Sequence, residues 1–141
     1  MNQNNGKKIL LVEDEPDVLQ VTKKTLESAG YDVITACDGK EGLEIARKDL
    51  PDLIVLDLLL PGMDGYKVCG ILKHDIQYMT IPILILSGRS KPKDHELGIK
   101  VGANGYLTKP FEPKVLIDKV AELIRLSPKK HSSVKDSTQR S

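Results

Sequence analysis

The residues best suited to chemistry in this sequence follow directly after short apolar runs. Continuous apolar runs are typical of strands that are buried on both faces of a parallel sheet. In an open parallel sheet the carboxyl ends of the strands meet at one edge, where ligands bind. We therefore expect the polar groups after these runs to lie close together. They are Glu13, Asp14 and Glu15 after 9–12, Asp57 after 53–56, Ser87 after 83–86, and Thr108 and Lys109 after 106–107.

The expected cluster combines the groups that phosphoryl transfer requires. Two or three carboxylates held close together repel one another, and a bound divalent cation such as Mg²⁺ removes that cost. An ammonium and a hydroxyl can bind phosphoryl oxygens, which is the chemistry available to Lys109 and Ser87. A carboxylate can also act as the nucleophile and form an aspartyl phosphate. The sequence therefore predicts a site that receives a phosphoryl group.

The segments between the apolar runs have the pattern of amphipathic helices. Pro16 suits the first turn of one helix and Gly30 suits the position just past its end. Asp38 and Glu41 have the spacing of a capping box that opens another helix. Five strands that alternate with five helices indicate an α/β fold, with a parallel sheet covered on both faces. The strands are expected at 9–12, 33–36, 53–56, 81–86 and 106–107, and the helices at 16–29, from 38 to about 50, at 66–74, at 94–101 and from 113.

Length and composition indicate one ordinary domain with two terminal segments. Of the 141 residues, 40% are apolar and 29% are charged, which is enough apolar material for a core. The formal net charge of +1 disfavours a generally basic nucleic-acid binder. This charge is uneven, because residues 127–141 carry a net charge of +3 and residues 1–126 a net charge of −2. We expect a flexible N-terminus at 1–6, a domain at 7–126 and a basic disordered tail at 127–141.

The remaining patterns disfavour membrane, secreted and metal-centre classes. No apolar run approaches the ~20 residues of a membrane-spanning helix, and no signal-peptide pattern is present, so the cytoplasm is the expected compartment. Cys37 and Cys69 lack the spacing of a disulfide framework or a zinc site and are expected as small buried residues. His74, His95 and His131 have no partners at ligand spacing and are expected at the surface without a role.

Four motifs around the predicted cluster resemble those of the response-regulator receiver domain of two-component signalling. They occur in the order of that family, and the resemblance covers about residues 7–126. It implies a flavodoxin-like (CheY-like), doubly wound sheet of five parallel strands in the order 2-1-3-4-5, with five helices. The motifs are Ile-Leu-Leu-Val-Glu13-Asp14-Glu15-Pro16, Leu-Ile-Val-Leu-Asp57-Leu-Leu-Leu-Pro61-Gly-Met-Asp-Gly65, Ile-Leu-Ile-Leu-Ser87-Gly88 and Gly102-Ala-Asn-Gly-Tyr106-Leu-Thr-Lys109-Pro110-Phe111.

The resemblance implies a role for each acid of the cluster. Asp57 would accept a phosphoryl group from a phosphohistidine on a sensor histidine kinase or a histidine phosphotransfer protein. Asp14 and Asp57 would bind Mg²⁺ directly, Glu13 would act through a water, and Leu59 would bind through its backbone carbonyl oxygen. Lys109 would contact the phosphoryl group.

The resemblance also implies a conformational switch. Ser87 and Tyr106 would form the switch pair, with the hydroxyl moving toward the phosphoryl group and the ring turning inward. Leu59 and Arg89 stand two positions beyond the acceptor and the switch hydroxyl, and would tune the lifetime of the phosphoryl group. The bulky Leu59 predicts slow autodephosphorylation. The Lys109–Pro110 peptide bond would be cis.

The output surface that the resemblance implies is formed by the fourth helix, fifth strand and fifth helix, at 97–101, 106 and 114–119. It would bind a downstream protein, a second receiver or an attached domain. The chain would be a monomer, or a phosphorylation-dependent dimer where the partner is a second receiver. No direct contact with nucleic acid or membrane is expected. Residues 127–141 are too few for an output domain, so we expect a stand-alone receiver, with a fragment of a longer regulator as the alternative.

Two further functions stay open on the sequence. An aspartate-nucleophile phosphatase on a similar sheet would need a second acid two positions after the nucleophile, where this chain has Leu59. The chain has neither a glycine-rich phosphate loop nor a dinucleotide fingerprint, which disfavours a nucleotide enzyme. A receiver-like scaffold that works without phosphate is disfavoured because the acids, hydroxyl and lysine are all present. We expect no catalysis beyond self-phosphorylation from a donor and autodephosphorylation.

Overall fold

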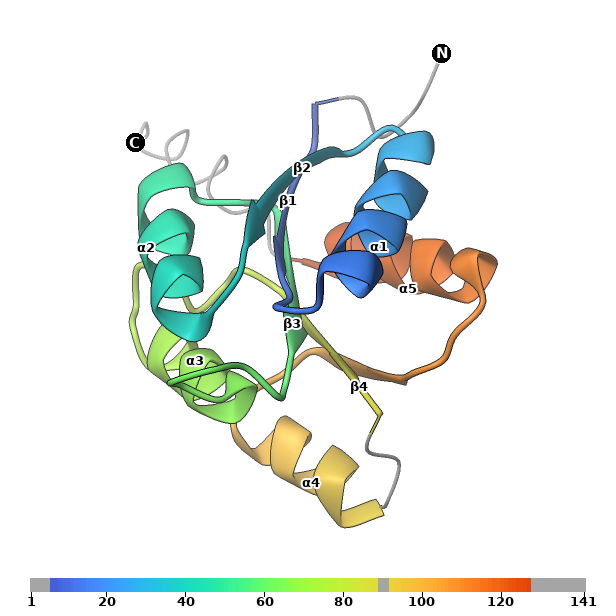
Figure 1. Cartoon of the computed structure of the whole chain (residues 1–141). Coiled ribbons are helices and arrows are strands. Elements are labelled where there is room, and N and C mark those ends of the chain that lie inside the picture. Colours follow the sequence, from blue (N-terminus) through green and yellow to red (C-terminus); the bar gives the residue numbers. More distant parts are fainter. Residues whose placement is uncertain (1–5, 89–91, 128–141) are drawn as a thin grey trace, which may run out of the picture.

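The structure, a computed structural model, describes residues 6–88 and 92–127, and strands and helices alternate within them as predicted. All strand pairings are parallel, and the strand order is β2-β1-β3-β4-β5. This confirms the α/β fold and its strand order. Most of the two terminal segments, residues 1–5 and 128–141, lies outside the described residues. The elements (Figure 1) are β1 (Lys8–Val12), α1 (Pro16–Ser28), β2 (Asp32–Ala36), α2 (Gly39–Asp49), β3 (Leu53–Asp57), α3 (Gly65–Lys73), β4 (Ile83–Ser87), α4 (Pro92–Lys100), β5 (Gly105–Thr108) and α5 (Pro113–Leu126).

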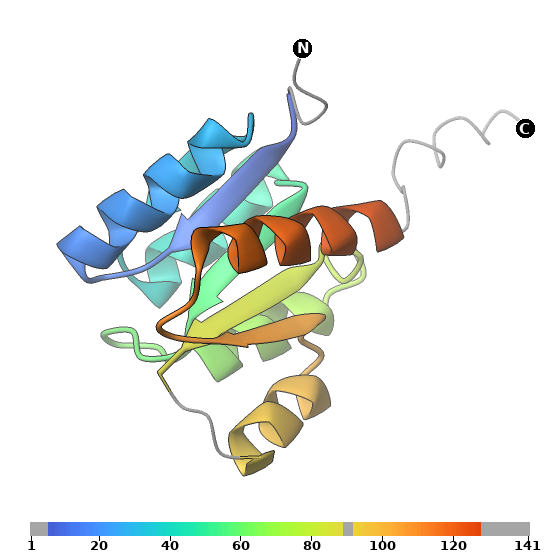
Figure 2. The same cartoon turned by 90° about the vertical axis from the view of Figure 1, so that its right-hand side faces the viewer.

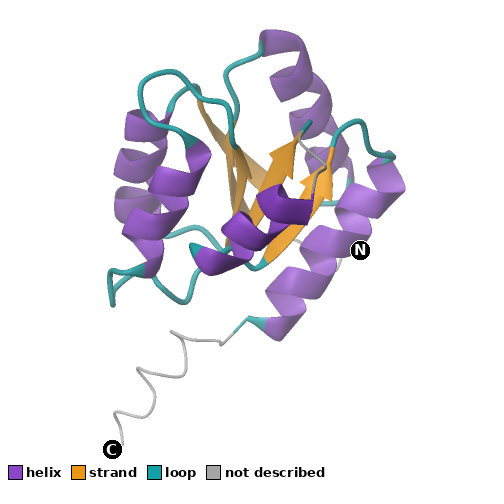
Figure 3. Cartoon of the chain, turned by 90° about the horizontal axis from the view of Figure 1, so that it is seen from below, coloured by secondary structure: helices purple, strands orange, loops and turns teal. Residues whose placement is uncertain are grey.

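The helices cover both faces of the sheet. α1 and α5 lie on one face, and α2, α3 and α4 lie on the other (Figure 1, Figure 2). Because side chains alternate along a strand, each strand supplies both layers. Leu11 of β1 packs in the cluster that includes Leu26 of α1, and its neighbour Leu10 packs in the cluster that includes Leu72 of α3. The sheet therefore lies between two helical layers, as the view from below shows (Figure 3).

Burial is deepest in the centre of the sheet. All residues of β3 and β4 are buried, as their unbroken apolar runs predict. β5 lies at the edge of the sheet and is half-buried along its whole length. α4 packs beside it and contributes one buried residue, Gly98. The centre is thus well covered, and the side formed by α4 and β5 is more open.

The predicted helix signals are present in the structure. Asp38 Oδ1 accepts a hydrogen bond from the Glu41 backbone N–H at 2.8 Å, which opens α2. Glu41 Oε1 accepts a hydrogen bond from the Cys37 backbone N–H at 2.8 Å, one residue before the cap. Gly30 follows α1 with φ of 97°, a left-handed conformation that favours glycine. Among the helices of the described residues, none has the length and apolar composition to cross a bilayer.

Two expectations about individual side chains are wrong. Cys37 is exposed, because it lies in the turn between β2 and α2, whereas Cys69 is buried in α3 as expected. His95 does not lie free at the surface, because its ring is half-buried and stacked on Tyr106. His74 is exposed as expected. The third histidine of the sequence, at position 131, lies outside the described residues.

Candidate functional site

Three acidic side chains meet at the carboxyl edge of the sheet. Glu13 and Asp14 follow β1, and Asp57 is the last residue of β3, the neighbour of β1 in the sheet. One carboxylate oxygen from each residue lies within 4.8 Å of the other two. Glu13 is 1% exposed and Asp57 is 7% exposed, whereas Asp14 is open to solvent. The structure therefore brings together the acids that the sequence predicts.

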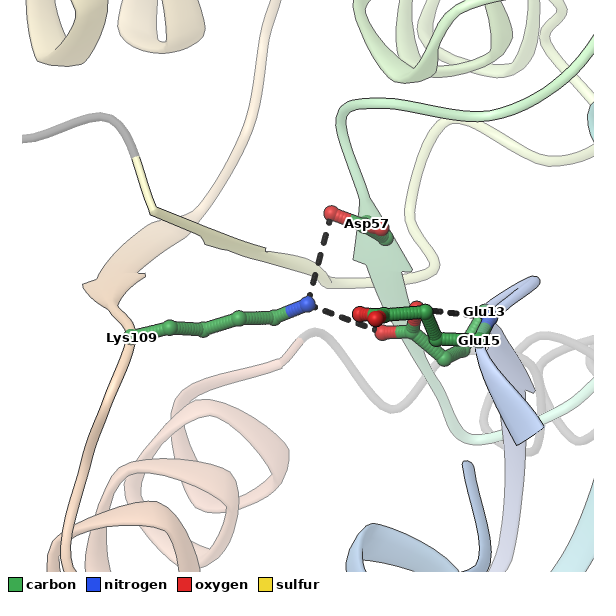
Figure 4. Close-up of polar contacts among 4 residues, drawn as sticks. All are labelled: Glu13, Glu15, Asp57 and Lys109. Atoms are coloured by element: carbon green, nitrogen blue, oxygen red, sulfur yellow. Dashed lines mark hydrogen bonds and ion pairs between the residues drawn. The ribbon is translucent and has the colours of Figure 1, made fainter. Parts of the chain in front are cut away.

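Lys109 supplies a positive charge to this cluster. Its Nζ donates a hydrogen bond to Glu13 Oε1 at 3.0 Å and lies 3.6 Å from Asp57 Oδ1 (Figure 4). Its backbone N–H donates to the Ser87 carbonyl oxygen at 2.7 Å, which ties the segment after β5 to the end of β4. The Lys109–Pro110 peptide bond is cis, as the family resemblance implies. The lysine thus reaches acids at the carboxyl ends of two other strands, β1 and β3.

The electrostatics of the cluster are clearest at Glu13. Burial raises the pKa of Glu13, and the hydrogen bond from Lys109 opposes that rise. The charge of Asp57 raises this pKa further, while the Glu15 backbone N–H donates to Glu13 Oε2 at 3.2 Å and lowers it. The cluster therefore holds three carboxyl groups, and the Lys109 ammonium contacts two of them, Glu13 and Asp57. A divalent cation can relieve such an excess of negative charge.

The chain after β3 folds back tightly onto the backbone of Asp57. The Gly65 N–H donates to the Leu58 carbonyl oxygen at 2.9 Å, and Asp64 caps α3 by accepting a backbone N–H at 2.9 Å. A Cβ on Gly65 would lie 2.5 Å from the Asp57 carbonyl oxygen, so this position requires glycine. Leu59, in the same segment, is 57% exposed. The predicted lifetime-tuning side chain is therefore available to solvent.

The predicted switch residues lie on neighbouring strands beside the acids. Ser87 is fully buried at the end of β4, opposite Thr108 in the sheet register. Tyr106 is half-buried on β5 and pairs with Ile85, two positions further from the acidic edge. Arg89, the second predicted tuning residue, lies outside the described residues.

His95, which the sequence does not single out, contacts the predicted switch residue Tyr106. Its ring centroid lies 3.9 Å from that of Tyr106, and the two ring planes are inclined by 27°. In the sequence His95 stands three residues before Gly98, and residues three apart share a helical face. This spacing is the available signal that His95 lies on the same face of the helix as Gly98. Leu97 and Ile99, the apolar residues of α4, are exposed. Hydrophobic periodicity therefore does not detect the face of α4 that packs on the sheet.

Known proteins are similar to this chain in sequence. The family model for the response regulator receiver domain matches residues 9–121. The alkaline phosphatase synthesis transcriptional regulatory protein PhoP of Bacillus subtilis is 45% identical over 122 residues, which cover 86% of this chain and 50% of that protein. The chain thus spans about half the length of the curated relatives it matches.

Solved structures share its fold. A response regulator of Chloroflexus aurantiacus has a TM-score of 0.82 at 37% identity, over 84% of this chain and 98% of that chain. The receiver domain of a sensor histidine kinase from Pseudomonas aeruginosa has a TM-score of 0.80 at 32% identity, over 85% of this chain and 98% of that chain. That structure is described with a magnesium ion coordinated in its active site cleft. Because the matching motifs, the strand order and the family model all agree, this chain belongs to the response regulator receiver domain family.

Proposed function

We propose that this receiver domain is a phosphoryl acceptor of two-component signalling and that Asp57 carries the phosphoryl group. The donor is a phosphohistidine on a sensor histidine kinase or a histidine phosphotransfer protein. The P–N bond to the imidazole breaks as a P–O bond to an Asp57 carboxylate oxygen forms, and the imidazole takes up a proton. The observation that supports the proposal is the position of Asp57, within 4.8 Å of two further acids and 3.6 Å from the Lys109 ammonium.

The donor set at this edge fits Mg²⁺. This ion prefers oxygen ligands and commonly uses one or two carboxylates together with waters and a phosphate oxygen. In the proposed site Asp14, Asp57 and the Leu59 backbone carbonyl oxygen would hold the ion, and Glu13 would act through a water. When bound, Mg²⁺ neutralises charge on the acids and on the transferred group. The receiver domain from Pseudomonas aeruginosa, described with a magnesium ion in its active site cleft, supports the choice of Mg²⁺ as the ion.

Lys109 and Ser87 are proposed to bind the oxygens of the phosphoryl group. The Lys109 ammonium contacts the Asp57 carboxylate, so it also lies near a group attached to that carboxylate. Asp57 pairs with Leu86 in the register of β3 and β4, which places Ser87 one residue further along the neighbouring strand. Charge-assisted hydrogen bonds from an ammonium and a hydroxyl are stronger than neutral ones. These two residues therefore favour the phosphorylated state.

The phosphoryl group is proposed to shift a conformational equilibrium through the switch pair Ser87 and Tyr106. A moderate shift needs only a few kcal/mol of differential interaction with the two states. The proposed readout surface consists of α4, β5 and α5, which expose Leu97, Ile99 and Val115. Apolar side chains on a surface suit a protein partner. The partner is a target protein or a second receiver in a phosphorylation-dependent dimer.

The curated relatives favour a second candidate, the receiver of a longer transcriptional regulator. The relative from Bacillus subtilis is named a transcriptional regulatory protein, and this chain matches half of it. In that arrangement the same readout surface would control an attached domain. The gene sequence downstream of Ser141 tests this candidate directly.

Leu59 is proposed to lengthen the life of the aspartyl phosphate. Its apolar side chain stands two residues after Asp57 and can hinder an attacking water. A Leu59→Asn variant should lose the phosphoryl group faster than the wild type. An unchanged rate of loss, followed by intact-mass spectrometry, would contradict the proposal. Arg89 remains a second tuning residue on the family resemblance.

Phosphorylation by a small donor tests the proposed function. With Mg²⁺ and acetyl phosphate, the wild-type protein should gain the mass of one phosphoryl group, and Asp57→Asn should not. Asp32→Asn is the matched control, because Asp32 is an exposed acid at the opposite end of β2 from the acidic edge. A wild-type protein that gains no mass from acetyl phosphate or a phosphohistidine donor would instead be a scaffold. Multiple turnover of a phosphomonoester would indicate a phosphatase.

A further inference from the structure

Tyr106 packs against a contact site on α4 that consists of His95 and Gly98. The His95 ring stacks on the tyrosine ring with the centroids 3.9 Å apart. A Cβ on Gly98 would lie 3.2 Å from Tyr106 Cδ2, so the absence of a side chain lets the ring approach the helix closely. Residues three apart share a helical face, and both contacts therefore come from one face of α4.

This contact site provides a large part of the packing of α4 against the sheet. Gly98 is the one buried residue of α4, and the flanking Leu97 and Ile99 are exposed. A further contact comes from the Tyr66 hydroxyl, which donates to the Asp94 carbonyl oxygen at 3.0 Å. An element with few buried apolar contacts opens or moves at low cost. The position of α4 therefore depends strongly on the ring of Tyr106.

Stacking on Tyr106, rather than hydrogen bonding, holds the His95 ring in place at this contact site. Its Nε2 is buried and has no hydrogen-bond partner among the described residues. An unpartnered buried nitrogen is unfavourable, so the face of Tyr106 is the contact that stabilises this ring position. A cleft that is also lined by Ala103 and Asn104 lies beside the pair. The tyrosine ring thus has space next to it.

We propose that His95 is the positioning residue that couples Tyr106 to α4. The inference rests on the proposed function, in which a phosphoryl group on Asp57 changes the position of the tyrosine. When that ring moves, α4 follows it or the stack is lost. Because loss of the stack costs free energy, states in which the ring and α4 move together are favoured over states in which only one of them moves, which is the condition for coupling. Without a ring at position 95, Tyr106 still responds to the site but α4 does not.

Two substitutions separate ring stacking from the chemistry of the imidazole. His95→Ala removes the ring, whereas His95→Phe keeps a ring that can stack and lacks the unpartnered nitrogen. Glu96→Ala, at the exposed neighbouring position, is the matched control. Each protein is labelled with ¹⁵N and with 3-fluorotyrosine. The chain has four tyrosines, and Tyr106→Phe assigns the fluorine resonance of interest.

The expected results have two parts. Without any phosphoryl mimic, the Tyr106 fluorine resonance should move toward its position in the unfolded chain in His95→Ala and stay in place in Glu96→Ala. With Mg²⁺ and beryllofluoride, the β3 amides next to Asp57 should shift in all four proteins. The α4 amides should shift in the wild type, Glu96→Ala and His95→Phe, and should lose this response in His95→Ala.

The two proposals fail in different ways. If the wild-type β3 amides do not respond to Mg²⁺ and beryllofluoride, the proposed function is overturned and the coupling with it. If they respond and the α4 amides of His95→Ala shift as in the wild type, only the role of His95 is overturned. Loss of the α4 response in His95→Phe as well would overturn stacking as its basis. A merely structural role of His95 would not separate the response of α4 from that of β3.

Discussion

The centre of the sheet and the flank formed by α4 and β5 differ in how completely they are packed. Every residue of β3 and β4 is buried, and no space for a side chain exists at Gly65 beside Asp57. On the α4–β5 flank, β5 is half-buried and α4 buries one residue. Regions with few buried apolar contacts open at lower free energy than well-packed ones. The acids and the switch hydroxyl of Ser87 thus lie on the well-packed part of the fold, and the switch ring of Tyr106 lies on the looser part.

This division has a physical basis. Groups that stabilise developing charge work best when they are already in place, because no reorganisation is then needed during transfer. A switch has the opposite requirement, since its two states must differ by only a few kcal/mol for one phosphoryl group to shift them. Lys109 connects the two parts. Its ammonium contacts the acids, and its backbone N–H donates to the Ser87 carbonyl oxygen at the end of β4.

The largest expected contrast between the two parts is in stability. Leu56 is fully buried in β3, so Leu56→Ala leaves a cavity and should lower the free energy of unfolding by about 2–5 kcal/mol. Leu97→Ala on α4 removes a side chain that is 42% exposed and should change the free energy of unfolding by about 0.5 kcal/mol or less. Urea denaturation measures both. Similar losses in the two variants would contradict the difference in packing.

The next contrast compares two glycines of α3. In Gly65→Ala the new Cβ lies 2.5 Å from the Asp57 carbonyl oxygen, and such overpacking should cost about 1–3 kcal/mol and slow phosphorylation by acetyl phosphate. In Gly70→Ala the Cβ meets no atom within 4 Å, and the gain in helix propensity should stabilise the protein by about 1 kcal/mol or less. Equal phosphorylation rates in both variants would show that the segment after β3 does not hold Asp57 in place.

Cysteine reactivity reports on the packing of the centre through pH. Burial raises the pKa of Cys69 to about 11, whereas Cys37 is exposed. Because the thiolate is the nucleophile, iodoacetamide at neutral pH should label Cys37 and leave Cys69 unmodified in the folded protein.

The same pKa has a consequence for stability. The folded-state pKa of Cys69 lies above its ordinary value of 9.0. The buried, protonated thiol therefore contributes to the free energy of unfolding below about pH 9, and this contribution is lost as the pH rises toward 11. Labelling of Cys69 should begin over the same range, and peptide mass spectrometry at stepped pH follows it, with Cys37→Ser as the control. Rapid labelling of Cys69 at neutral pH would contradict a closed α3 interface.

The centre of the fold could be predicted because local pattern and topology determine it together. Unbroken apolar runs indicate strands buried on both faces, and parallel strands bring their carboxyl ends to one edge. These two rules are enough to bring Glu13, Asp14 and Asp57 together with Lys109, although the strands that carry them are far apart in the chain. The strand order itself came from the family resemblance and not from periodicity.

The α4–β5 flank could not be predicted in the same way. Its key contact joins a histidine and a glycine of α4 to a tyrosine of β5, and neither of the α4 residues contributes to apolar periodicity. The exposure of Cys37 escapes prediction for a related reason. Its residue type is usually buried, but the turn that opens α2 keeps it at the surface. In both cases tertiary contacts, rather than residue type or spacing, decide the environment.

The smallest expected effect on the free energy of unfolding comes from adding a side chain at Gly98. This change tests whether residues on the looser flank can move to accept the new atoms, as residues in the centre cannot. In Gly98→Ala the new Cβ would lie 3.2 Å from Tyr106 Cδ2 and 3.5 Å from Ile85 Cδ1, so the tyrosine ring must move by a few tenths of an ångström. Alanine also improves the helix propensity of α4 by about 1 kcal/mol. If the ring can move, these effects nearly cancel, and the free energy of unfolding should change by less than about 1 kcal/mol, while the Tyr106 fluorine resonance shifts. A loss as large as that of Gly65→Ala would mean that Tyr106 is held as firmly as the backbone of Asp57, and a switch on this flank would then need a different moving part.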